Sequence, residues 1–204
     1  MIEKLFNLPS ILRVRLSPLY NRWYFKRMGV RFGSNMMVIG KVPIIGPGKI
    51  TIGDNFIMTS GEHVSAIISN LQGSLFTSSA DATITINVGM SSTRIWVHNR
   101  LAIGNNVKVG GDVLIIDTDS HELNYMVRNG SSPSGNVWGE TIKSSPIVIE
   151  DDVWIGAQCI VLKGVTIGAR TIIGAGSVVA KSIPADCIAA GNPCRIIKKI
   201  NQNN

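Results

Sequence analysis

Aromatic residues, cysteines and long apolar runs are scarce in this sequence, and each shortage excludes a class of protein. Only 6% of its 204 residues are aromatic although 45% are hydrophobic, so Ile, Val and Ala have to build the core, among 21 glycines. No window reaches the ~18–20 uncharged apolar residues of a membrane span. Arg13 and Arg15 interrupt the apolar stretch near the N-terminus where a signal peptide would have its core. We therefore expect one domain with a thin, repetitive core.

Cysteine usage is typical of a reducing compartment. The three cysteines, Cys159, Cys187 and Cys194, are odd in number and lack C-x-x-C spacing. A disulfide scaffold would show an even number at regular spacings, so we expect a cytoplasmic protein.

Basic charge is concentrated at the N-terminus. The chain has a formal net charge of +7, but residues 1–31 hold seven basic side chains and one acid, which leaves +1 for the rest. Residues 1–30 are also rich in apolar side chains, so we expect an amphipathic helical cap at one end of the domain. Contact of residues 1–27 with anionic lipid headgroups at the inner membrane is the alternative. Nucleic-acid binding is not expected, because no nucleic-acid-reading motif accompanies the charge.

A repeat of six residues runs through the C-terminal part of the chain. Its aliphatic positions are Ile149, Ile155, Val161, Ile167, Ile173 and Val179. The companions four residues later are mostly small or β-branched: Val153, Cys159, Val165, Thr171, Ser177 and Ile183. A helix would repeat every 3.6 residues and a flat strand every two. A period of six predicts short strands joined by tight turns, with each aliphatic pointing to one axis and a Gly or Ala beside it where a larger Cβ would obstruct the backbone.

The same period appears earlier in the chain and is interrupted once. Four more aliphatic residues follow one another at intervals of six: Val97, Ile103, Val109 and Ile115. The step from Ile115 to Ile149 is not a multiple of six, so the period is interrupted there. Residues 117–146 are therefore expected to leave the coil as a loop that is long enough to be functional.

These repeats resemble the bacterial hexapeptide-repeat acyltransferases. The similarity is strongest in the segment DDVWIGAQCIVLKGVTIGARTIIGAGSVVAKSIPADCIAAGNPCRIIKKI. The segment IGNNVKVGGDVLIIDTDSHELN is similar to the His-bearing segment of the sugar and polysaccharide O-acetyltransferases, which include the maltose and galactoside enzymes and enzymes that modify capsule or O-antigen. The resemblance implies an all-β fold, a left-handed parallel β-helix over residues 31–185 with a tail at 186–204. It also implies a homotrimer with active sites between subunits and acetyl-CoA as acyl donor.

His121 is the residue that the resemblance implies as catalytic base. A sugar hydroxyl is a poor nucleophile until its proton is removed, and imidazole titrates near neutral pH. Asp119 or Asp117 would orient the ring and stabilise the imidazolium, with Asp119 favoured. The alternatives are a solvated loop histidine and two aspartates that cap the loop backbone.

Neither a metal nor a covalent nucleophile is expected at this loop. A metal site needs a third or fourth ligand at defined spacing, but His63 and His98 are distant in sequence and no HxxxH or CxxC pattern exists. A relay through Ser120 lacks the strand, turn and helix of a nucleophile elbow. Direct transfer from a thioester to a hydroxyl also requires no acyl-enzyme.

The resemblance further implies that acetyl-CoA lies in a groove between neighbouring subunits. Small residues would offer backbone groups to the pantetheine arm, an exposed Trp would wall the groove, and cations would face the phosphates. The matching positions are Trp154, Gly156, Ala157, Ala175, Ala180, Lys181, Arg195 and Lys198. Plain turn geometry for the glycines and a solvated tail for the cations are the alternatives.

The acceptor contacts depart from the family's pattern. Galactoside-type enzymes bind the acceptor with an Asn one or two coils before the His, where this chain has NVGMSSTRIWVHN. Asn87, Ser92 and Arg94 are therefore the candidates for acceptor binding, with ordinary strand positions as the alternative.

Together these features predict an acetyl-CoA-dependent sugar O-acetyltransferase of surface polysaccharide biosynthesis, with direct attack assisted by His121. N-acetylation of an amino or nucleotide sugar is one alternative. Acetylation of serine is another, although serine acetyltransferases carry a far larger helical N-terminal domain. From a different class, a non-catalytic β-helix used for assembly would need neither the histidine nor the Lys181 and Arg195 cations.

Overall fold

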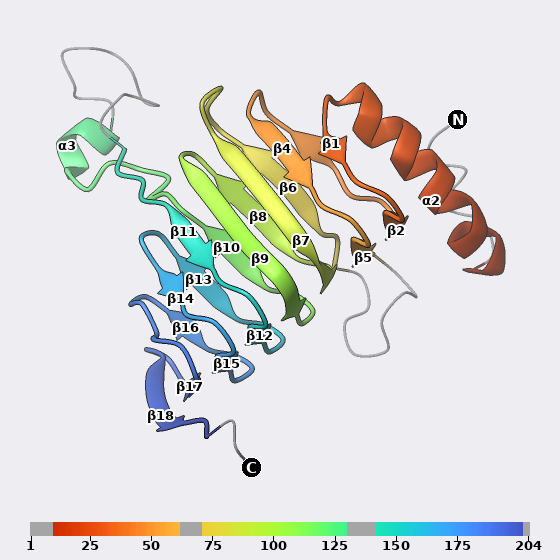
Figure 1. The fold of residues 1–204 in the computed structure, drawn as a ribbon. Coiled ribbons are helices and arrows are strands. Elements are labelled where there is room, and N and C mark those ends of the chain that lie inside the picture. Colours follow the sequence, from red (N-terminus) through yellow and green to blue (C-terminus); the bar gives the residue numbers. More distant parts are fainter. Residues whose placement is uncertain (1–9, 62–70, 130–141, 202–204) are drawn as a thin grey trace.

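The computed structural model describes residues 10–61, 71–129 and 142–201. In these residues, short strands follow one another around a common axis and pair with the strands of the next turn (Figure 1). A turn of this coil contributes strands to three faces in succession. Among the described strands, only the last pair, β17 with β18, is antiparallel.

The three faces follow from the strand pairings. The first face contains β1 (Arg31–Phe32), β4 (Lys49–Ile52), the first half of β7 (Thr83–Ser91), the first half of β9 (Arg100–Val109), β11 (Ile147–Ile149) and β14 (Thr166–Ile167). The second face contains β2 (Met37–Ile39), β5 (Ile57–Thr59), the second halves of β7 and β9, β12 (Trp154–Ile155), β15 (Ile172–Ile173), β17 (Cys187–Ala190) and β18 (Arg195–Lys199). The third face contains β3 (Ile44–Ile45), β6 (Ser74–Thr77), β8 (Arg94–Val97), β10 (Leu114–Ile116), β13 (Ile160–Leu162) and β16 (Val178–Val179).

The core is a column of aliphatic side chains along the axis. The six aliphatic residues of the C-terminal repeat are each at most 1% exposed, and the parallel register stacks Ile149 on Ile167 and Ile155 on Ile173. Full burial of such a side chain stabilises the fold by about 1.5–3 kcal/mol. These pairings agree with the expected coil of short strands.

Glycine follows the inward aliphatic because successive coils approach closely. A Cβ on Gly156 would lie 2.5 Å from the backbone nitrogen of Ala175, and a Cβ on Gly168 would lie 2.3 Å from that of Ala185. Neither glycine has a left-handed φ. The small residue is therefore required by the contact between coils and not by the conformation of its own turn.

Helix α2 (Ser10–Arg27) lies on the N-terminal end of the coil, where the cap was expected (Figure 1). Its Phe25 is fully buried. Gly29, with a φ of 75°, follows its last turn, and the Val30 N–H donates to the Phe25 carbonyl oxygen at 3.0 Å. A glycine in the left-handed conformation is a common way to end a helix. Within the described residues, no helix is long and apolar enough to cross a membrane.

The chain leaves the coil after β10 and returns at β11, as the break in the period predicts. The two ends of this excursion, residues 117–146, run side by side: the Ser145 N–H donates to the Asp117 carbonyl oxygen at 2.9 Å, and the Asp119 N–H to that of Lys143 at 3.0 Å. The short helix α3 (Tyr125–Arg128) lies within it. At the other end of the chain, β17 still pairs with β15, so the stacked strands continue to Ala190 and β18 folds back on them.

Candidate active site

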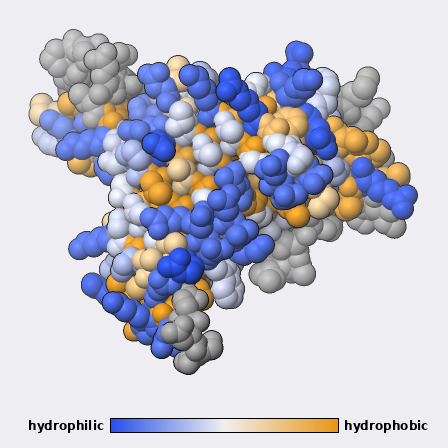
Figure 2. Space-filling view, in the orientation of Figure 1, coloured by the Kyte–Doolittle hydropathy of each residue, from blue (hydrophilic) through white to orange (hydrophobic). Residues whose placement is uncertain are grey.

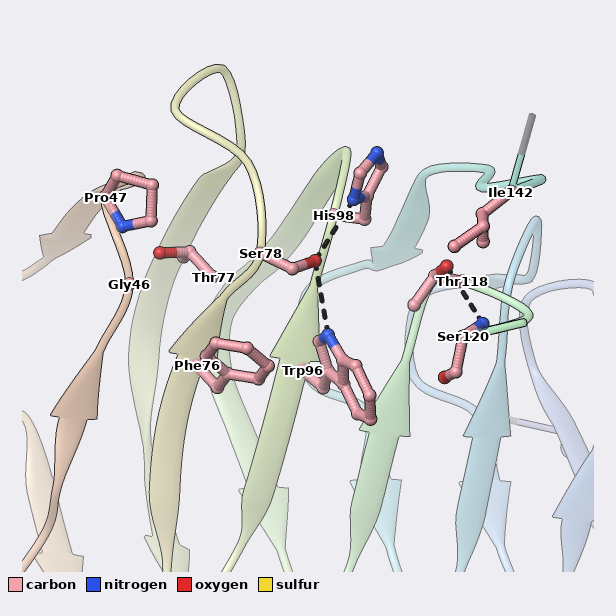
Figure 3. Close-up of a pocket in the computed structure, with 10 residues that line it drawn as sticks. All are labelled: Gly46, Pro47, Phe76, Thr77, Ser78, Trp96, His98, Thr118, Ser120 and Ile142. Carbon is pink, nitrogen blue, oxygen red and sulfur yellow. Dashed lines mark hydrogen bonds between the residues drawn. The ribbon is translucent and has the colours of Figure 1, made fainter. Parts of the chain in front are cut away.

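A groove of about 400 Å³ lies at the corner where the third face turns into the first, beside the base of the excursion (Figure 3). Its walls come from successive coils and from both ends of the excursion. The lining residues are Gly46, Pro47, Phe76, Thr77, Ser78, Trp96, His98, Thr118, Ser120 and Ile142. The groove therefore lies where the chain begins the segment that carries His121.

The parallel register of the third face brings the lining together. Strands β6, β8 and β10 pair so that Phe76, Trp96 and Ile116 are neighbours. Their side chains alternate with the inward aliphatics and point outward. The rings of Phe76 and Trp96 are 5.2 Å apart between centroids, at 46° to each other. The two rings give one side of the groove an aromatic wall.

Ser78 orients His98 at the rim of this wall (Figure 3). The Trp96 Nε1–H donates to Ser78 Oγ at 3.2 Å, and Ser78 Oγ lies 3.1 Å from His98 Nδ1. The indole nitrogen can only donate, so the serine oxygen accepts from it and its own hydrogen is available to Nδ1. Either tautomer of His98 completes this contact, because the serine hydroxyl can donate to Nδ1 or accept from Nδ1–H.

Asp117 is fully buried and fixes the turn that carries His98. Its carboxylate accepts the backbone N–H groups of His98, Asn99 and Arg100 at 2.6, 2.8 and 2.9 Å. Burial raises the pKa of this carboxyl, while the three N–H donors and His98 act in the opposite direction. Asp117 thus caps a turn of the preceding coil, a variant of the capping alternative that the sequence left open.

Asp119 forms an ion pair with Lys163 across the base of the excursion. Lys163 directly follows β13 on the next coil, so the pair joins the outgoing chain to the coil to which it returns. His121 is exposed and follows Ser120, whose φ of 63° turns the chain. The structure therefore brings the Asp119 carboxylate to a lysine that sequence reasoning did not single out.

The three residues expected to bind the acceptor lie at other corners of the coil. Asn87 is where the first face turns into the second, against Gly53 and beside a second groove of about 490 Å³. Ser92 is 2% exposed, and Arg94 forms an ion pair with Asp112 at 2.5 Å. Within one chain, none of them lines the groove beside the excursion. The strand pairing explains this, because each corner of the coil is formed by residues at equivalent positions of successive turns.

The residues expected to bind acetyl-CoA divide into two groups within the chain. Trp154 is 54% exposed on the second face, and Gly156, Ala157 and Ala175 stack on adjacent coils after it. Arg195 and Lys198 are exposed on β18, which pairs with β17 of the same face. By contrast, Ala180 and Lys181 are exposed after β16, where the third face ends.

Sequence reasoning missed several groove residues although the repeat carries a signal for them. Ser78 precedes His98 by 20 residues and His98 precedes Thr118 by 20, and each lies just beyond a strand of the third face. A turn of 20 residues, as in the pairing of Ser74 with Arg94, aligns them, whereas a strict period of six does not. From the sequence, His98 comes into consideration only as a metal ligand, and its distance in sequence counts against that role.

No group of three or more His, Cys, Asp or Glu side chains that would suit a metal ion occurs among the residues that the structure describes. The three cysteines carry free thiols. Burial raises the pKa of both Cys159 and Cys194, so each favours the thiol form.

Comparison with known sequences identifies the repeat. Residues 146–181 match the family model "Bacterial transferase hexapeptide (six repeats)". Over 100 residues the chain is 46% identical to a putative acetyltransferase of Schizosaccharomyces pombe, covering 49% of this chain and 44% of that protein. It is 38% identical over 104 residues to galactoside O-acetyltransferase of Escherichia coli, covering 51% of this chain and 46% of the enzyme. The chain thus matches a little under half the length of these relatives.

Solved structures share the fold. A serine-to-cysteine mutant of AntD, an N-acyltransferase from Bacillus cereus, in complex with dTDP-4-amino-4,6-dideoxyglucose and coenzyme A, superposes with a TM-score of 0.67 over 89% of both chains, at 20% identity. The same enzyme with dTDP and 3-hydroxybutyryl-CoA gives a TM-score of 0.61 at 21% identity. These structures show the fold, and the match of residues 146–181 to the hexapeptide model agrees with the resemblance seen in the sequence.

Proposed function

We propose that this chain, a member of the bacterial hexapeptide-repeat transferases, transfers an acetyl group from acetyl-CoA to a sugar hydroxyl on a left-handed parallel β-helix. The observation that carries the proposal is the groove beside the excursion, which combines an aromatic wall, an oriented histidine and the start of the segment bearing His121. The similarity to galactoside O-acetyltransferase supports a hydroxyl acceptor.

The chemistry that we propose is direct transfer. His121 takes the proton of the acceptor hydroxyl while its oxygen attacks the thioester carbonyl carbon. The C–S bond then breaks, and the CoA sulfur leaves and takes up the proton held by the imidazolium. No acyl-enzyme forms, so neither Ser120 nor a cysteine acts as nucleophile.

The two aspartates support this chemistry from different places. The ion pair of Asp119 with Lys163 fixes the base of the excursion and thereby the start of the segment that leads to His121. Asp117 fixes the turn of His98. Both act as positioning residues: Asp119 for the segment that leads to the proposed base His121, and Asp117 for the acceptor contact His98.

The acceptor is proposed to lie in the groove. Aromatic rings suit the C–H faces of a sugar ring, and polar groups at the rim fix its orientation. His98, held by Ser78 through Nδ1, offers its Nε2 as a hydrogen-bond partner for a sugar hydroxyl. In this proposal, Trp96 and His98 take the place of Asn87, Ser92 and Arg94 as the acceptor contacts of the same chain.

Acetyl-CoA is proposed to bind against the second face and the corner beyond it. There the Gly156–Ala175 contact brings backbone close to the surface, the exposed Trp154 offers a wall, and Arg195 and Lys198 offer charge to phosphates. Ala180 and Lys181, at a different corner, fit a site completed by a second subunit. A homotrimer, a cytoplasmic setting with peripheral membrane contact and a role in capsule or O-antigen synthesis belong to the same proposal.

The test is an acetyl-transfer assay with His121→Ala. Purified protein and acetyl-CoA are offered free oligosaccharides, nucleotide sugars and amino sugars, and released CoA is measured. Loss of the base should lower turnover by about 10²–10⁴-fold, with an unchanged melting temperature and unchanged CoA binding by calorimetry. Wild-type turnover in this variant would remove His121 from the mechanism. Absence of CoA binding in the wild type would favour an assembly role, and acetylation of amines alone would change the acceptor class.

A further inference from the structure

Helix α2 packs on the coil through a partly polar side. Among the α2 side chains that the structure describes, the fully buried ones are Ser17, Asn21 and Phe25. The Gly40 N–H donates to Ser17 Oγ at 3.2 Å, and Asn21 Nδ2 donates to the carbonyl oxygens of Val38 and Gly40. Two of the three anchors are therefore hydrogen-bonded polar side chains.

The apolar stripe of α2 faces away from the coil. Leu12, Leu16, Leu19 and Trp23 are spaced by four, three and four residues, which places them on one side of a helix. Leu12, Leu19 and Trp23 are 46%, 68% and 56% exposed. A helix that only capped the coil would turn this stripe inward, so the exposed stripe serves something other than the cap.

Exposed cations flank the stripe. They are Arg15, Arg22, Lys26 and Arg27. Residues 10–27 contain no Asp or Glu. In the space-filling view, apolar and strongly hydrophilic residues lie side by side over α2 (Figure 2). The partner of this face has to accept apolar side chains and carry negative charge.

We propose that the outward face of α2 docks the protein on an anionic lipid surface. An amphipathic helix lies in the headgroup region with its apolar stripe down and its cations among anionic headgroups. Trp is favoured at that depth because its ring is apolar and its N–H is polar. A second copy of the same face fits less well, because pairing two α2 helices would bring their cations together without an acid between them.

Vesicle co-sedimentation of the full chain tests the docking. The probes are vesicles of phosphatidylcholine with 30–40% phosphatidylglycerol, about a third anionic lipid, and vesicles of phosphatidylcholine alone. Binding should require the anionic lipid and weaken with salt. Arg22→Gln with Lys26→Gln should weaken it on the order of thirtyfold, since each cation near the surface contributes about 1 kcal/mol. The control pair Lys49→Gln with Lys108→Gln removes the same charge from exposed positions on the coil and should bind as the wild type does.

A second pair of variants tests the apolar stripe. Leu19→Gln with Trp23→Gln should abolish binding to anionic vesicles, whereas Met37→Gln with Ile57→Gln, exposed apolar residues of the coil, should not. Melting temperatures report whether each variant is folded. The proposal would be overturned if the two variant pairs bound anionic vesicles equally well. It would also be overturned if the wild type bound neutral vesicles as well as anionic ones. A change of oligomeric state in sedimentation velocity, without loss of vesicle binding, would assign the face to a second copy instead.

Docking has a consequence for the acceptor that rests on the proposed function. The Ile44 N–H donates to the Tyr24 hydroxyl of α2 at 3.1 Å, and Gly46, two residues later, lines the groove. A glycan carried on a lipid in the same surface would therefore lie near the groove. Arg22→Gln with Lys26→Gln should lower turnover of a lipid-linked oligosaccharide in vesicles severalfold and leave turnover of the released oligosaccharide unchanged. An equal loss of turnover on the lipid-linked and the released oligosaccharide would contradict this consequence, and the vesicle-binding result would still stand.

Discussion

The carboxylate of Asp117 holds the backbone of His98, a residue of the preceding coil, through an N–H···Oδ1 hydrogen bond of 2.6 Å. Asp117 is the first residue of the excursion, and His98 lines the groove. The contact therefore links the start of the excursion to the wall of the candidate acceptor site. Asp117 is close to His121 in the sequence, but its carboxylate accepts a hydrogen bond from the backbone of His98.

Asp117→Asn should destabilise the protein. The amide keeps one acceptor oxygen and turns an NH₂ group toward backbone N–H donors, which leaves buried donors unpaired at about 1–3 kcal/mol each. We expect a fall in melting temperature of about 5–10 °C, measured by differential scanning calorimetry. An unchanged melting temperature would mean that water satisfies the turn.

The same variant gives a pH dependence with a defined sign. Burial raises the pKa of Asp117, so folding favours the protonated carboxyl. The stabilising contribution of the protonated Asp117 carboxyl to folding is complete below the unfolded pKa of about 3.9. It is lost as the pH rises through the raised pKa of the folded state. The difference in melting temperature between the wild type and Asp117→Asn should therefore become smaller as the pH rises above about 4. A difference that widens over this range would show that the three N–H donors outweigh burial.

Ser78→Ala should raise the KM for the acceptor without changing the KM for acetyl-CoA. The substitution frees the His98 ring and the Trp96 N–H from their shared partner, and one lost orienting hydrogen bond corresponds to about tenfold in binding. Arg94→Gln, at another corner, provides the comparison. If Arg94→Gln raises the acceptor KM and Ser78→Ala does not, the acceptor site lies with the residues expected from the sequence.

Lys163→Met and Asp119→Asn should lower kcat by similar factors, and the double variant should be no worse than either. The pair is partly exposed and contributes only about 1 kcal/mol to stability, so its larger effect is expected on the position of the excursion. Arg170→Gln removes a comparable, bidentate ion pair with Asp186 and should leave kcat unchanged. Additive losses from Lys163→Met and Asp119→Asn would indicate separate roles.

The coil was predictable from the sequence because its signal is local. One inward aliphatic every six residues is a constraint that each turn of the chain repeats, and positions such as Ile155 and Ile173 are buried as expected. The excursion was predictable for the same reason, since the step from Ile115 to Ile149 breaks the phase.

The site was predictable only in part because it depends on pairing between coils. Lys163 reaches Asp119 from 44 residues away, and Ser78 meets His98 from the preceding coil. The number of residues in each turn of the coil decides which side chains of neighbouring turns meet, and this number varies along the chain. The residues assigned to acetyl-CoA by resemblance, among them Trp154 and Arg195, stay predictions, because the contacts within one chain do not test them.

Gly156→Ala should destabilise the coil, whereas Gly89→Ala should not. A Cβ on Gly156 would meet the Ala175 nitrogen at 2.5 Å, a backbone atom of the next coil that cannot move aside by itself. Gly89 lies on β7 of the same face, and its Cβ would meet only the Ile57 carbonyl oxygen at 3.9 Å. We expect a loss of about 1–3 kcal/mol for the first variant and little change for the second, measured by urea unfolding. Because the Gly156 contact also lies in the proposed acetyl-CoA surface, an alanine there that is tolerated in stability but weakens CoA binding would show that ligand approach, and not coil stacking, requires the glycine.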